Sequence, residues 1–135
     1  MPIFALALLL TIGPAQYGNI NLLYAPGGFG SLDGTVPPAT CEVVVDVFNT
    51  SGKQVATGTF NLTLGQTGTL TFGRGGGVFT QQAMLVNNCP ADSMNCDPTL
   101  CNISESIETV NSLTLQTQVL QTGFVSRPFI DQLSN

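Results

Sequence analysis

The chain has 135 residues, four cysteines and no histidine, and only 8% of its residues are charged. This length fits one domain with a single core. Its three basic residues are too few to neutralise a run of phosphates, so nucleic acid is not expected as a partner. The net charge of −5 comes from dispersed acidic residues and indicates no particular ligand.

The apolar run at the start of the chain, within MPIFALALLLTIGPAQ, is about half as long as a transmembrane helix must be. We therefore expect no transmembrane span. The run has the pattern of a secretory signal with a small-residue cleavage site at Gly13-Pro14-Ala15, although no lysine or arginine precedes it. Residues 1–15 are interpreted either as a signal, which would leave a chain starting at Gln16, or as a core strand or insertion segment that stays on the protein. In the second case the segment could donate a strand to the sheet of a neighbouring subunit. Residues 16–135 are expected to form one domain.

From Gln16 onward, short apolar stretches alternate with glycine, proline and asparagine at intervals of about ten residues. This rhythm predicts an all-β fold, a single antiparallel β-sandwich of about 7–8 strands stapled by disulfides. The first predicted strand lies in GNINLLY, and APGGFGSLDGTVPPAT predicts a long loop after it. CEVVVDVFN is the clearest strand. The first strand is expected to run through Ile20, Leu22 and Tyr24, and in the second the face of Val43, Val45 and Val47 is expected to lie in the core.

The next stretches, QVATGTFNLTL and TLTF, continue the series in a way that resembles a meander, with Leu70 and Phe72 pointing inward. GRGGG is interpreted as a hairpin tip, because it lacks the Lys-Ser/Thr ending of a phosphate loop. VFTQQAMLVN and NISESIETVNSLTLQTQVL then predict three more strands. One face of the last is expected to hold Leu113, Leu115, Thr117 and Val119. Helical periodicity is absent after the N-terminal run, so little helix is expected.

Three of the four cysteines lie in VNNCPADSMNCDPTLCN. Zinc and iron–sulfur sites use closely spaced cysteine pairs that this stretch lacks, and no imidazole is available to activate a catalytic thiol. Two disulfides are therefore the simplest interpretation. Of the three possible pairings, we prefer Cys41–Cys101 with Cys89–Cys96. The first bridge would join distant parts of the sheets, and the second would close a small loop.

The segment TVPPATCEVVVDVFNTSGKQVATGTFNLTLGQTGTLTF, followed later by CNISESIETV, resembles a module of exported proteins from environmental bacteria. The likeness covers about residues 36–119. It consists of a proline-rich lead, a cysteine, an alternating strand, a glycine turn, a second strand that closes in a Gly-Gln turn, and a later cysteine that begins another strand. That family has no assigned activity. The resemblance implies a secreted β-sandwich and supports the Cys41–Cys101 pairing.

Other candidate sites have less specific patterns. Asp92, Asn95 and Asp97 offer oxygen ligands for calcium, at a spacing that misses the EF-hand pattern. Glu105 and Glu108 would fall on opposite faces of a strand, so a solvated surface is expected rather than a carboxylate pair for glycoside hydrolysis. Three sequons would carry glycans only in an organism that glycosylates them. They begin at Asn49, Asn61 and Asn102.

Without histidine no catalytic triad can form, and no nucleophile-elbow pattern occurs, so neither enzymatic activity nor a metal or cofactor is expected. We expect a non-enzymatic structural protein that is secreted or held at the cell surface and forms an extracellular assembly such as a filament. Its neutral surface lacks the charges that keep sheet edges apart, which favours self-association. The alternative is an extracellular module that binds a glycan or another protein through its loops. The aromatic residues available for a sugar are Tyr17, Tyr24 and Phe79.

Overall fold

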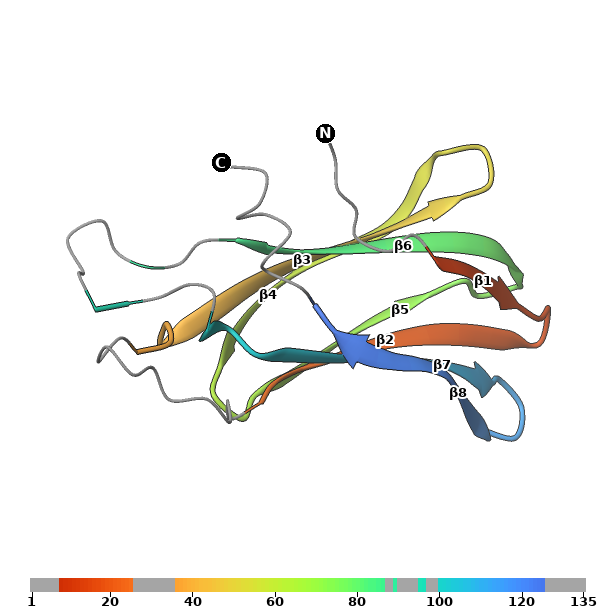
Figure 1. Ribbon diagram of the computed structural model, residues 1–135. Coiled ribbons are helices and arrows are strands. Elements are labelled where there is room, and N and C mark those ends of the chain that lie inside the picture. The colour runs from red at the N-terminus through yellow and green to blue at the C-terminus, as the bar shows by residue number, and fades with distance from the viewer. Residues whose placement is uncertain (1–7, 26–35, 87–88, 90–94, 97–99, 126–135) are drawn as a thin grey trace.

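A computed structural model describes residues 8–25, 36–86, 89, 95–96 and 100–125. The described residues form eight strands in two four-stranded antiparallel sheets. Figure 1 shows the two layers from the side, with β3 and β6 in one and β2 and β7 in the other. No helix occurs in the part of the chain that the structure describes. The predicted all-β sandwich is confirmed.

The strands are β1 (Leu8–Ile12), β2 (Gln16–Tyr24), β3 (Thr40–Asn49), β4 (Gln54–Thr63), β5 (Thr67–Phe72), β6 (Gly77–Val86), β7 (Ile103–Asn111) and β8 (Thr117–Phe124). The first sheet has the order β1-β6-β3-β4, and the second has the order β5-β2-β7-β8. Within one sheet, consecutive strands are paired only as β3–β4 and β7–β8 among the described strands. Every other connection carries the chain from one sheet to the other.

The core lies between the sheets and follows from the alternation of apolar residues. β2 and β3 each lie inside their sheet, flanked by a strand on both sides, and contribute inward side chains along their length. The following inward side chains of the two strands are at most 2% exposed, which confirms the predicted core face of the valines: Ile20, Leu22, Tyr24, Val43, Val45 and Val47. Phe72 and partly buried Leu70 of β5 also face the core.

The predicted meander is wrong, because β5 leaves the sheet of β3 and β4. The turn after β4 binds the end of β2 in the opposite sheet. There the Gly65 amide donates to the Tyr24 carbonyl at 2.8 Å, and the Tyr24 amide donates to the Gln66 carbonyl at 3.1 Å. GRGGG is likewise not a hairpin tip, since it connects β5 of one sheet to β6 of the other.

The prediction that Leu113 and Leu115 lie on one face of the last strand is wrong. Leu113 and Leu115 lie in the turn between β7 and β8, where they are 86% and 67% exposed. The side chain of Asn111 accepts a hydrogen bond from the Leu113 amide at 2.9 Å, and Leu115 has a φ of 60°. An asparagine that bonds the following backbone favours a turn over a continued strand.

β1 is an edge strand of the first sheet and pairs with β6 along its length. Leu10 and Ile12 point into the core and are 5% and 2% exposed, whereas Leu9, which precedes Leu10, faces solvent and is 70% exposed. A tight turn follows, in which the Gln16 amide donates to the Gly13 carbonyl at 3.0 Å. Residues 8–12 are therefore a core strand in this structure. No described helix is long and apolar enough to cross a membrane.

Two disulfides join the cysteines in the pairs preferred from the sequence. Cys41 and Cys101 are 60 residues apart with a Cα–Cα distance of 6.0 Å, and Cys89 and Cys96 are 7 residues apart with a distance of 5.6 Å. Cys41 lies in β3, and Cys101 immediately precedes β7. The longer bridge is buried and connects the two sheets.

Candidate functional site

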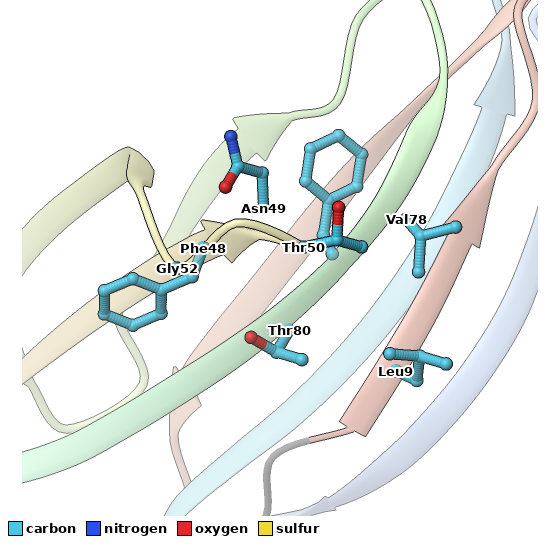
Figure 2. A pocket seen from close by; sticks show the side chains of 8 residues that line it. Leu9, Phe48, Asn49, Thr50, Gly52, Val78 and Thr80 are labelled. Atoms are coloured by element: carbon cyan, nitrogen blue, oxygen red, sulfur yellow. The ribbon is translucent and has the colours of Figure 1, made fainter.

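One shallow hollow lies on the outer face of the first sheet, between β1, β6 and the turn after β3. Figure 2 shows the side chains that surround it, among them Leu9, Val78 and Phe48. Its volume is about 420 Å³, and its lining is Leu9, Phe48, Asn49, Thr50, Gly52, Val78, Phe79 and Thr80. This lining contains no acid, base or thiol, so it offers no group for acid–base, nucleophilic or metal chemistry.

A second hollow, of about 370 Å³, lies on the outer face of β2, β5 and β7 among polar side chains. The Thr69 hydroxyl donates to Asn21 Oδ1 at 2.8 Å, and Asn21 Nδ2 donates to Ser106 Oγ at 3.4 Å. A parallel row joins Thr71, Asn19 and Glu108 at 2.8 and 3.4 Å. In each row the asparagine side chain of β2 forms hydrogen bonds with residues of both neighbouring strands, β5 and β7. These polar groups therefore stabilise the sheet.

Two of the three aromatic residues considered for a sugar platform are buried. Tyr24 is 2% exposed and donates its hydroxyl to the Pro38 carbonyl at 2.8 Å. Phe79 is 8% exposed and meets the Phe72 ring edge-on. Tyr17 lies at the surface, but the Arg74 guanidinium sits over its ring at 4.4 Å. Tyr24 and Phe79 therefore cannot form a sugar platform, and glycan binding remains a prediction.

Sequence reasoning missed a buried polar pair between the sheets. Gln81 of β6 is 4% exposed, and its Nε2 donates to Glu105 Oε1 of β7 at 3.3 Å. Glu105 lies on the inward face between buried Ile103 and Ile107. Gln81 Oε1 and Glu105 Oε2 have no hydrogen-bond partner. The signal was present in the sequence, because Gln81 occupies an inward position in the alternation of its strand.

Burial raises the pKa of Glu105, and the hydrogen bond from Gln81 lowers it by a smaller amount. A protonated carboxyl would donate from Oε2 to Gln81 Oε1 and satisfy both unpaired atoms. The prediction that Glu105 and Glu108 face opposite sides of a strand is confirmed, since Glu108 lies on the outer face and accepts from Asn19. The predicted solvated surface is wrong for Glu105.

The calcium hypothesis falls largely outside the described residues, since Asp92 and Asp97 are not among them. The Asn95 carbonyl accepts a hydrogen bond from the Val36 amide at 2.6 Å. No cluster of three or more metal-ligating side chains occurs in the described ranges. Of the sequons, Asn61 is exposed on β4, whereas Asn49 Oδ1 accepts the Ser51 amide in a turn at 3.0 Å.

The free sheet edges offer a different kind of site. β4 and β5 lie against each other at one side of the sandwich, while β1 and β8 are the edges at the other. β8 reads TQVLQTGF and carries neither a charge nor a proline. Val119 is 58% exposed and Leu120 39% exposed. Edge strands of monomeric proteins are normally protected by charge, proline or covering segments. Among the described strands none pairs with the outer edge of β8, which is therefore the candidate interaction site.

Comparison with known protein families, curated proteins and solved structures gives no match. Function is therefore inferred from the chain's own geometry.

Proposed function

We propose that the protein is a non-enzymatic structural protein, exported to the cell surface or the extracellular space, whose copies associate through their sheet edges. The observation that carries this proposal is the outer edge of β8, which is uncharged and displays exposed Val119 and Leu120. An edge strand without charge or proline presents backbone donors and acceptors that another strand can satisfy.

Two disulfides support the location, because such bonds persist in oxidising compartments. The low proportion of charged residues supports association through strand edges. With 8% charged residues, the surface supplies few ion pairs and few like-charge repulsions, so backbone pairing and apolar burial are the forces left to drive association.

Light scattering after size-exclusion chromatography, with electron microscopy of the same fractions, tests the proposal on the full disulfide-linked chain. We expect species larger than the monomer. Val119→Lys should weaken association by about tenfold or more, because it places a charge on the edge that must be desolvated. Leu113→Lys is the matched control, since Leu113 is 86% exposed in the turn outside the strand, and it should associate like the parent.

A parent chain that stays monomeric at all concentrations would overturn the proposal and favour the binding module. Equal association of both lysine variants and the parent would exclude β8 as the contact.

A further inference from the structure

β8 contains a nearly palindromic stretch, Thr117-Gln118-Val119-Leu120-Gln121-Thr122. Read in reverse, it differs only by the exchange of valine and leucine at its centre. Two copies laid antiparallel about the Val119–Leu120 bond would place threonine opposite threonine and glutamine opposite glutamine. Each central valine would meet a leucine.

In a regular strand this register would be incompatible with two-fold symmetry. Alternate residues point to opposite faces, so Thr117 and Thr122, five positions apart, would lie on different faces. A two-fold axis perpendicular to the paired strands maps the upper face of one copy onto the upper face of the other. Residues that lie opposite each other across the pair must therefore occupy the same face of their strand.

The register of β8 against β7 shows how this conflict is removed. The pairing shifts between Ile107 and Glu108, and Leu120 is the extra residue, because Val119 lies opposite Glu108 and Gln121 opposite Ile107. Such a bulge inserts one residue and changes the alternation beyond it. Thr117 and Thr122 consequently lie opposite Val110 and Ser106, two positions on the same face of β7.

We propose that β8 pairs antiparallel with β8 of a second copy about a two-fold axis at Val119–Leu120, with Thr117 opposite Thr122 of the other copy. The bulge and the palindrome are independent features: the bulge makes this register compatible with two-fold symmetry, and the palindrome places like residues opposite each other in it. The pair would join the two second sheets into one continuous sheet. It would also cover Val119 and Leu120, which are 58% and 39% exposed in the single chain.

Charge does not oppose this contact. The acidic residue in register with Val119 is Glu108 on β7. The Glu108 residues of the two copies would be separated by three strand spacings, or about 14 Å. This exceeds the screening length of about 8 Å at physiological ionic strength. An isologous pair closes on itself, so a larger assembly would use a further edge, such as that of β1.

This inference rests on the proposed function and names one of its contacts. The test uses full-length Thr117→Cys and Thr122→Cys variants with the native disulfides intact. Opposed residues in antiparallel strands have Cα atoms about 4.5–5.5 Å apart, within the range of a disulfide. Brief oxidation of an equal mixture should produce dimers linked between positions 117 and 122, identified by mass spectrometry.

Each variant alone should cross-link poorly, because the bulge leaves like positions four strand spacings apart, or about 13–14 Å. Ser112→Cys, exposed in the turn before β8, replaces Thr117→Cys in the control mixture and should also cross-link poorly. Similar yields from all mixtures, or links in another register, would overturn the inference. If the parent chain still associates in that case, the proposed function stands and only this contact fails; a strictly monomeric parent overturns both.

Discussion

Glu105 occupies a position that alternation reserves for an apolar side chain. In register it lies opposite Leu22 of β2 and Gly123 of β8, and Gln81 faces it across the sandwich. None of these three neighbours is charged, so no cation offsets ionisation of the carboxyl. Burial of the carboxyl consequently favours the neutral acid and raises the pKa of Glu105.

The raised pKa of Glu105 predicts how stability changes with pH. Between the ordinary carboxyl pKa and the raised folded-state value, the unfolded chain loses its proton while the folded chain keeps it. The folded state then binds more protons, so this group's contribution to stability falls as pH rises through that window. Below the ordinary carboxyl pKa the contribution is fully present. Urea unfolding measured across mildly acidic to neutral pH should show the decline.

Glu105→Gln should remove this decline. An amide at position 105 donates to Gln81 Oε1 and accepts from Gln81 Nε2 at every pH. The variant should be more stable than the parent at neutral pH by about 1–3 kcal/mol, the usual cost of leaving a buried polar group unsatisfied. Glu108→Gln, on the outer face of the same strand, is the matched control and should retain the decline that burial of Glu105 causes. A Glu105→Gln variant with the parent's pH profile would show that Glu105 is ionised in the folded protein.

At the scale of single elements, β1 has the clearest test. Leu10 is 5% exposed and Leu9, its neighbour in the same strand, is 70% exposed. Leu10→Ala should lower the free energy of unfolding by about 2–5 kcal/mol, because it leaves a cavity in the core. Leu9→Ala should change it by less than about 0.5 kcal/mol. Chemical denaturation of both variants measures the difference.

Equal effects of the two substitutions would mean that β1 is not docked on β6. The result also bears on the two interpretations of residues 1–15. A chain cut before Gln16 would lack β1, and the core would lose Leu10 and Ile12 with it.

The positions of strands were predictable from the sequence where apolar and polar residues alternate strictly. The sheet to which each strand belongs was not predictable. Val43, Val45 and Val47 alternate with more polar positions, so their face can be read directly. The crossing from β4 to β5 depends on hydrogen bonds between the Gly65–Gln66 turn and Tyr24, residues distant in sequence. No local pattern reports such contacts, which is why the meander prediction failed.

The candidate edge at β8 was also only partly predictable from the sequence. A palindrome in β8 is visible in the sequence, but its meaning depends on a bulge at Leu120 that only the pairing with β7 reveals. In the sequence, Leu113 and Leu115 extend the apolar alternation of β8 toward the N-terminus. In the structure the Asn111 side chain closes a turn there and leaves both leucines exposed.

For the whole molecule, the two disulfides should contribute unequally to stability. In the chain-entropy model, the 60-residue separation of Cys41 and Cys101 corresponds to about 4 kcal/mol, and the 7-residue separation of Cys89 and Cys96 to about 2.5 kcal/mol. The longer bridge also connects the two sheets through buried sulfurs. Paired cysteine-to-alanine variants should differ accordingly in denaturant unfolding. A larger loss on removing Cys89–Cys96 would contradict this order.

The net charge of −5 on the whole chain predicts how association responds to salt. Copies with the same sign of charge repel each other, and the Debye length falls from about 30 Å at 0.01 M to about 8 Å at 0.15 M ionic strength. The proposed contact consists of backbone pairing and apolar side chains, which gain nothing from low salt. Association measured by sedimentation should therefore strengthen as salt is added over this range. Weakening would instead show that ion pairs hold the copies together, and the uncharged edge of β8 could not be the principal contact.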